Sequence, residues 1–148
     1  MKVLTTVPAL LNQEDVGVCG HLYGLALGSV DNTGRFEGDA FRLATAVPEI
    51  YALPVLGDRV VLNITDSLLG QYEGGGRALL HYSAVPNQLW FSHDPVALDI
   101  LAIKELERER RAAGAPQIKP RMDIYANANL LQLGENNLEK IHIERIQP

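Results

Sequence analysis

The chain has 148 residues, of which 47% are apolar and 21% are charged, a composition typical of one globular domain that can bury a single core. Its net charge of −5 argues against general affinity for nucleic acid or for an anionic membrane. No apolar run reaches the length of about 18 residues that a membrane span needs, and the first residues do not show a secretory signal pattern. We therefore expect a cytoplasmic protein that does not associate with a membrane. The single cysteine, Cys19, excludes an internal disulfide and a four-cysteine iron–sulfur cluster within the chain.

The N-terminal third is punctuated by glycines and gives weak signals. We expect a short helix over residues 7–14, a short buried strand over 15–19, and either a helix or a packed loop over 21–29. Residues 31–34 read Asp-Asn-Thr-Gly, which favours a turn because Asn and Gly both tolerate positive φ. A helix is predicted from Asp39 to Ala46, with Pro48 either restarting it or kinking it.

The clearest strand pattern covers residues 59–65. Val60, Leu62 and Ile64 alternate with polar or smaller residues, so we expect them to face the core. By the same alternation, Asp66 lies at the carboxyl end of this strand with its side chain on the core side. A glycine-rich loop follows over 70–77, and a second, aromatic strand is predicted over 88–92.

The strongest helix signal begins at Asp94. This side chain can cap a helix, and Pro95 suits the first helical position because its missing N–H has no partner there. Apolar residues then continue to Ile103, a charged run follows, and Gly114 is typical of a C-terminal cap. The pattern predicts a helix over 95–113 whose first half is buried. Asp99 is the anomaly, because a buried carboxylate needs a partner or a function.

The remaining residues complete an α/β pattern. An amphipathic helix is predicted over 123–133, with Gly134 as its cap, and a final strand over 140–145, with Ile141 and Ile143 inward. We therefore predict one α/β domain spanning 1–148, with a mixed sheet of about four strands packed with helices. An α+β arrangement is the alternative. Strands joined through a helix should be parallel.

Three motifs resemble an uncharacterised protein family, the domain of unknown function 362. They are Ile64-Thr65-Asp66-Ser67-Leu68, Gly70-Gln71-Tyr72-Glu73-Gly74-Gly75 and Asp94-Pro95-Val96-Ala97-Leu98-Asp99, in the family's order and spacing. The resemblance covers most of this chain but corresponds to only the C-terminal half of the usual family domain. Some members are fused to ferredoxin-like modules, so the resemblance implies a possible redox association, and no reaction is assigned to the family.

The sequence departs from the family pattern at one place. Family members usually carry a lysine with a histidine, and a lysine with an asparagine, before their Asn-Pro-like turn. Here these are reduced to His21 and the stretch Leu27-Gly28-Ser29. Any anion binding that depends on those lysines in relatives is therefore not implied for this chain.

Several acidic and glycine residues form the candidate site. If strands 59–65 and 88–92 are parallel neighbours, the end of the first strand and the start of the central helix open on the same rim of the sheet. Carboxylates there suit a hard divalent cation or acid–base work on a small molecule, and a triglycine can present N–H groups to an anion. The candidate ligand-binding residues are Asp66, Glu73, Gly74, Gly75, His93 and Asp99, with Asp66 and Asp99 as metal ligands.

Each candidate also has a structural interpretation. Asp94 is best explained as a helix cap, Asp66 can cap the turn that follows it, and Asp99 can pair with a basic residue such as Arg42, Arg59 or Arg77. On this view the chain is a non-catalytic module. It would associate with a second copy, or with a separate subunit that supplies the missing N-terminal half, through an exposed apolar surface. The sequence does not decide between these two classes.

Overall fold

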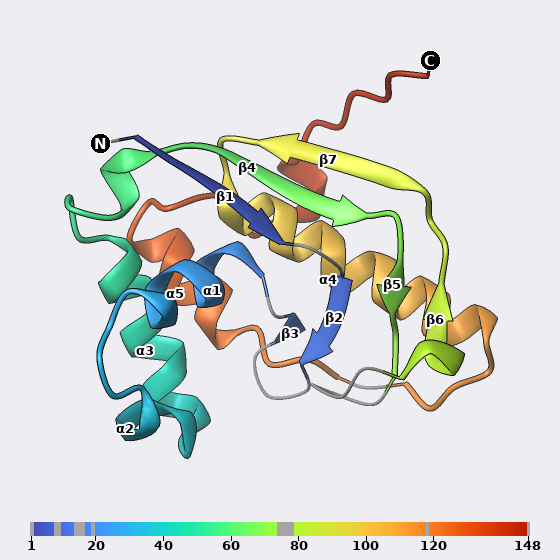
Figure 1. Ribbon diagram of the computed structural model, residues 1–148, viewed down its shortest axis with the longest axis horizontal. Helices are drawn as coiled ribbons and strands as arrows, with labels where there is room; N and C mark the ends of the chain where they lie inside the picture. Colours follow the sequence, from blue (N-terminus) through green and yellow to red (C-terminus); the bar gives the residue numbers. More distant parts are fainter. Residues whose placement is uncertain are drawn as a thin grey trace.

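A three-stranded sheet forms one layer of the protein. In the computed structural model, which describes residues 2–7, 10–13, 17–18, 20–73, 79–117 and 119–147, strands β1 (Val3–Val7), β4 (Val60–Ser67) and β7 (Gln88–Ser92) lie in the order β1-β4-β7 (Figure 1). β1 and β4, which are joined through helices, pair in parallel, as the connection rule predicts. β7 pairs with the other edge of β4 in the antiparallel direction.

A second, smaller sheet lies beside the first. It contains β2 (Leu10–Gln13), β3 (Gly17–Val18), β5 (Gly70–Gln71) and β6 (Ser83–Ala84), in the order β3-β2-β5-β6. Here β2 is parallel to β5, and the other two pairs are antiparallel. Strands β2, β5 and β6 of the second sheet lie on the side of the molecule away from the helices α1 and α3 (Figure 1).

Five helices and three short 3₁₀ turns complete the described structure. The helices are α1 (His21–Gly28), α2 (Gly34–Glu37), α3 (Ala40–Tyr51), α4 (Pro95–Ala112) and α5 (Asp123–Leu130). The 3₁₀ turns are η1 (Gly57–Arg59), η2 (Leu80–Tyr82) and η3 (Leu138–Lys140). Apolar side chains of α1, α3, α4 and α5 form one core, and the chain is therefore a single mixed α/β domain, as predicted, although its described strands form two sheets rather than the one sheet of about four strands that was predicted. The core includes Leu22, Leu43, Val47, Val96, Ile100, Ile103, Leu106, Ile124, Tyr125 and Ala128.

The central helix α4 begins and ends where the sequence predicts. Asp94 Oδ1 accepts a 2.8 Å hydrogen bond from Ala97 N, and Pro95 occupies the first helical position. At the other end Gly114 adopts φ +67°, the left-handed conformation that a helix C-terminus often requires. The sequence was sufficient to predict both ends of α4, because each cap is formed by residues next to the helix in the chain.

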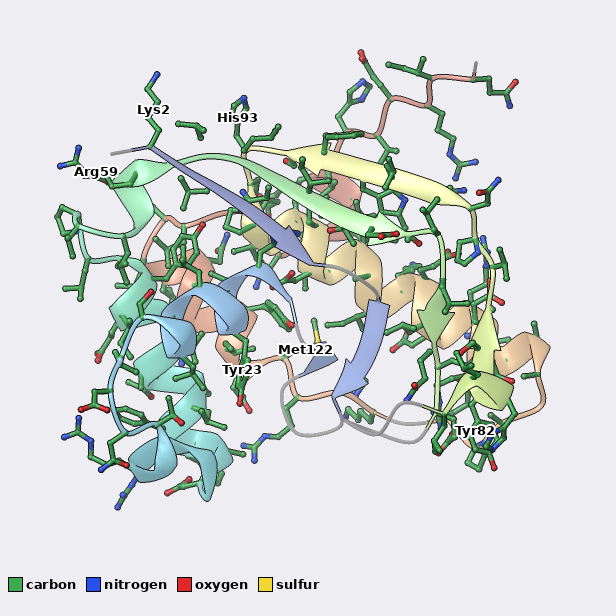
Figure 2. The ribbon with its side chains drawn as sticks, viewed as in Figure 1. Lys2, Tyr23, Arg59, Tyr82, His93 and Met122 are labelled. Carbon is green, nitrogen blue, oxygen red and sulfur yellow. The ribbon has the colours of Figure 1, made fainter. Side chains whose placement is uncertain are left out.

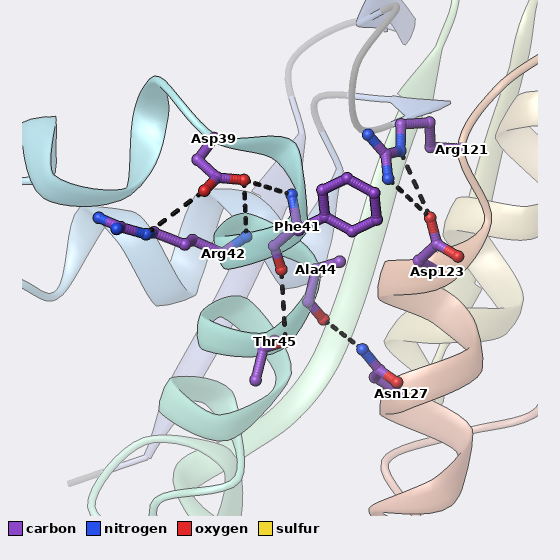
Figure 3. A network of polar contacts seen from close by, with 8 residues as sticks. All are labelled: Asp39, Phe41, Arg42, Ala44, Thr45, Arg121, Asp123 and Asn127. Atoms are coloured by element: carbon purple, nitrogen blue, oxygen red, sulfur yellow. Dashed lines mark hydrogen bonds and ion pairs between the residues drawn. The ribbon is translucent and has the colours of Figure 1, made fainter.

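Helix α3 extends past Ala46 to Tyr51 and contains Pro48, so of the two predicted alternatives the helix continues through the proline instead of restarting at it. A proline inside a helix removes the N–H that would bond to the carbonyl four residues earlier, here Ala44. Asn127 on α5 replaces it, because its Nδ2 donates a 2.9 Å hydrogen bond to Ala44 O (Figure 3). The helix therefore continues past the proline, and the repair also joins α3 to α5. Asp39 caps the start of α3 by accepting bonds from Phe41 N and Arg42 N.

Two predicted elements are wrong. Residues 7–14 are not helical where the structure describes them; they contribute to β1 and β2. The predicted strand over 140–145 is also absent, since η3 ends at Lys140 and residues 141–147 pair with no described strand. A strand needs a neighbouring strand to accept its backbone bonds, and the alternating pattern of these residues does not supply one. Of the predicted strand over 15–19, Gly17 and Val18 form β3, and residues 15, 16 and 19 lie outside the described residues.

The predicted orientation of β4 holds at Val60, which packs against the core, but is wrong from Leu62 onward. The side chains of Asn63, Thr65 and Ser67 are buried against the helices, whereas Leu62 and Ile64 are only half-buried on the opposite face. Burying polar residues requires hydrogen-bond partners. Asn63 Nδ2 donates to the carbonyls of Ser92 and His93, and Thr65 contacts His21; Ser67 Oγ has no partner among the described residues. The more apolar face of β4 therefore points away from the core.

Candidate functional site

Asp99 caps helix α1 from a distance. Its two carboxylate oxygens accept hydrogen bonds from His21 N at 2.9 Å and from Leu22 N at 3.3 Å. These are first-turn donors of α1, whose own N-cap residue, Gly20, has no side chain to satisfy them. A Cβ added at Gly20 would lie 2.1 Å from Asp99 Oδ1, so the glycine leaves room for the carboxylate. Among the described residues, the partners of Asp99 are thus backbone N–H groups rather than Arg42 or Arg59; Arg77, the third arginine predicted as a partner, lies outside the described residues.

Burial makes Asp99 a weak acid for an aspartate. Its pKa rises to about 7, because removal from water disfavours the charged form; the two N–H bonds act in the opposite direction, and nearby Asp94 adds repulsion. The same environment raises the pKa of Tyr51 to about 12, chiefly through burial and then through Asp99 and Asp94. A carboxyl group that is part protonated at neutral pH could exchange a proton, although its side chain is only 2% exposed.

His21 joins this buried region to the sheet. Its Nε2 lies 2.9 Å from Thr65 Oγ1, and burial lowers its pKa to about 4. The imidazole is therefore neutral at physiological pH. His21, Thr65 and Asp99 form a buried polar group between α1, β4 and α4, which we call the inner polar group. The sequence did not indicate it, because His21 had no ligand-like spacing to any other residue.

Asp94 bonds to two segments of the chain at once. Besides capping α4, it accepts a 2.8 Å hydrogen bond from Glu135 N through Oδ2. The chain passes so close here that a Cβ on Gly134 would lie 1.9 Å from Asp94 Oδ1. The structure thus extends the predicted helix-cap role of Asp94. The prediction that Gly134 caps a helix over 123–133 is wrong, because α5 ends at Leu130 with Leu131 as its C-cap; Gly134 instead allows the close approach of Asp94.

Asp66 caps a turn at the end of β4. Its Oδ1 accepts a 2.9 Å hydrogen bond from Leu68 N, and its side chain is half-buried. Because β-strand side chains alternate, Asp66 projects from the opposite face to Thr65, which contacts the inner polar group. The prediction that the Asp66 side chain lies on the core side is therefore wrong, and Asp66 and Asp99 lie on opposite sides of the sheet.

Glu73 pairs with a buried arginine. Its Oε2 lies 2.6 Å from Arg110 Nη1, and the side chain of Arg110 is only 4% exposed. The guanidinium also donates to the carbonyls of Tyr72 and Pro116. Arg110 thus fixes the start of the glycine-rich loop and the segment after α4 to the end of this helix. Gly74 and Gly75 lie outside the described residues.

His93 is exposed at the end of β7, where Figure 2 shows its side chain directed away from the fold. β4 and β7 are neighbours but antiparallel, with Asp66 paired to Leu89 and Asn63 to Ser92. The end of β4 and the start of α4 consequently lie at opposite ends of the sheet, and the predicted shared rim does not form. Within the described residues, no three His, Cys, Asp or Glu side chains are grouped so that they could hold a metal ion.

The sheet has an apolar face that includes Leu62 and Ile64, both of which were predicted to face the core. We call it the outer face and define it by Leu62, Ile64, Leu89 and Phe91. The register places Ile64 opposite Phe91 on neighbouring strands. Leu62 and Ile64 are half-buried. Leu89 and Phe91 remain 51% and 59% exposed. Only the pairing of β4 with β7, which no local pattern encodes, brings these four residues together.

No protein-family model, curated protein or solved structure matches this chain. The resemblance to the domain of unknown function 362 therefore rests on the three motifs alone. In the part of the chain that the structure describes, none of the helices has the length and apolar character that crossing a membrane would require.

Proposed function

We propose that this chain is a non-catalytic association module that binds another protein surface through its outer face. The observation that carries this proposal is the inverted orientation of β4, which leaves apolar side chains outward and buries polar ones. Contiguous exposed apolar surface on a folded protein is typical of a binding surface.

The composition of the outer face supports an interface core. Leu89 and Phe91 are more than half exposed, and covering each would contribute on the order of 1 kcal/mol, since complete burial of such a side chain is worth about 1.5–3 kcal/mol. Aromatic residues are enriched at the centres of protein interfaces, where they exclude water from the contact.

The carboxylates give less support to the alternative, a site for a divalent cation or a small molecule. Asp66, Asp94 and Asp99 already accept backbone hydrogen bonds, and Glu73 already pairs with Arg110. Each of these contacts has a structural explanation. A ligand would have to compete with bonds that also hold helix ends and turns in place.

Photochemical cross-linking in the cell tests the proposal. A photoreactive phenylalanine analogue at position 91 should cross-link to whatever covers the outer face. The matched control carries the same analogue in place of Leu130, which is 79% exposed on α5 and lies outside that face. The proposal predicts a discrete cross-linked protein from position 91 that position 130 does not give. Equal or no cross-linking from the two positions would refute it.

A further inference from the structure

We infer that the partner is a second copy of this chain, and that residues 141–147 of each copy, which we call the C-terminal segment, add as a strand to the open edge of β7 in the other. The inference deepens the proposed function by naming its partner. It rests on two features that pair with no described strand, the outer edge of β7 and the C-terminal segment.

The first feature is the edge of β7. This strand bonds to β4 on one side, and no described strand lies on its other side. Alternate residues of an edge strand present N–H and C=O groups that another strand can pair with, and natural proteins usually block such edges with charges, proline or a bulge. β7 reads Gln-Leu-Trp-Phe-Ser. It carries none of these blocking residues, so its edge is suited to pairing.

The second feature is the C-terminal segment. Ile141 and Ile143 alternate with His142 and Glu144, the pattern of a half-buried strand. The backbone at Ile141 is already extended, with φ −80° and ψ 116°. From there the chain runs outward past β7 and away from the helices (Figure 1), and Ile143 is 52% exposed. The segment thus has the alternating sequence of a strand and an extended backbone at its first residue, but it pairs with no described strand.

Length and charge are compatible with the exchange. Seven residues in extended conformation reach about 23 Å, whereas the five residues of β7 span about 17 Å. β7 is uncharged, and Glu144 and Arg145 carry opposite charges, so pairing brings no like charges together.

Symmetry favours a second copy over an unrelated protein. Ile141 packs against the core of its own domain, and the segment leaves from that anchor. A two-fold exchange then pairs both segments and both β7 edges in one closed dimer, whereas a different partner would satisfy only one of the two features in each chain. Strand addition to a sheet edge is an established mode of recognition between chains.

Sedimentation velocity of the full chain over a hundredfold concentration range tests the assembly, because a dimer dissociates on dilution. We expect a dimer for the wild type and for Ile143→Thr, which keeps the backbone donor and β propensity. Ile143→Pro removes that donor and should shift the protein to monomer at the same concentrations. Circular dichroism would verify that both variants remain folded. A monomeric wild type, or an Ile143→Pro variant that dimerises as well as the wild type, would overturn the inference.

Cysteine cross-linking tests the contact itself. Chains with Gln88→Cys are mixed with chains with Glu144→Cys and treated with a short bismaleimide, and mass spectrometry locates the linked peptides. We expect a link between positions 88 and 144 in two different chains. If a chain carrying both changes instead forms this link within a monomer, the segment folds onto its own sheet and the inference is wrong.

The two proposals can fail independently. Cross-linking of position 91 to a different protein by a monomeric chain would retain the association function and reject the exchange. A dimer linked between positions 88 and 144, with no cross-link from position 91, would retain the exchange and reject the outer face as the binding surface.

Discussion

Replacing Asp99 with asparagine tests whether the inner polar group titrates near neutrality. The pKa of Asp99 is about 7 in the folded protein, raised chiefly by burial, against 3.8 in the unfolded chain. Between these pH values the folded protein holds one more proton than the unfolded chain. Its free energy of unfolding therefore receives a contribution that is complete below pH 3.8 and is lost as the pH rises through 7.

His21 acts in the opposite direction. Burial lowers its pKa from 6.5 to about 4, so between these values the unfolded chain holds one more proton than the folded protein. Its contribution is complete above pH 6.5 and is lost as the pH falls through 4. Each group changes the free energy of unfolding by about 1.4 kcal/mol per pH unit, with opposite sign. We expect the contributions of Asp99 and His21 to cancel between about pH 4 and pH 6.5.

The Asp99→Asn variant removes the titration of Asp99 and leaves that of His21. The difference between 3.8 and 7 is about 3.2 pH units, equivalent to about 4 kcal/mol. As the pH rises from about 4 to about 8, the free energy of unfolding of the variant should therefore increase by up to about 4 kcal/mol relative to that of the wild type. At low pH it should be the less stable protein, because an asparagine oxygen can accept from only one of the two N–H groups oriented toward it while its own NH₂ group faces the other.

Urea unfolding followed by the fluorescence of Trp90, the single tryptophan, measures this difference at each pH. Asp123→Asn is the matched control, because that carboxylate is 59% exposed and should show no such trend. A difference between Asp99→Asn and wild type that stays constant within about 0.5 kcal/mol across the range would refute the reasoning. It would mean that the N–H groups of α1 keep Asp99 ionised despite its burial.

Two further predictions concern unfolding free energies measured in the same assay. Gly20→Ala should destabilise the protein by about 2 kcal/mol or more, because its Cβ would collide with Asp99, whereas Gly24→Ala, which meets open space inside α1, should stabilise it by about 0.5–1 kcal/mol. Equal effects of the two changes would contradict the capping geometry. Arg110→Met should lower the free energy of unfolding by about 3–5 kcal/mol, because it leaves a carboxylate and two carbonyls without their buried partner. The control, Arg111→Met, replaces an exposed side chain and should change this free energy by less than about 0.5 kcal/mol. Similar losses in both variants would contradict the role assigned to Arg110.

Elements with local signals could be predicted from the sequence. The helix that begins at Asp94 and the strand that ends near Asp66 were found within one or two residues, because capping and alternation are properties of neighbouring residues. The strand predicted over 140–145 failed because its formation depends on a partner strand. The sequence left open whether Pro48 restarts or kinks α3, because the carbonyl that the proline leaves without a donor is satisfied by Asn127, a residue 83 positions away.

The candidate site could be predicted only in part. The sequence identified Asp99 as a buried carboxylate that needs partners, but those partners are N–H groups 77 and 78 positions earlier in the chain. It placed Val60, Leu62 and Ile64 inward because apolar faces usually are buried. It could not show that Asn63 and Thr65 would find hydrogen bonds on the helix side and so could be buried instead.

The capping of α1 by Asp99 affects how the chain folds during its synthesis. The N–H groups in the first turn of α1 have their hydrogen-bond acceptor only after Asp99, 78 positions later than His21, has been synthesised. In the same way, β1 can pair with β4 only after β4 has been synthesised. At synthesis rates of about 5–20 residues per second, the start of α1 spends about 4–16 s without its cap. During that interval the N-terminal segment has no native tertiary partner from α4, so this is the stage at which a chaperone would have most to bind.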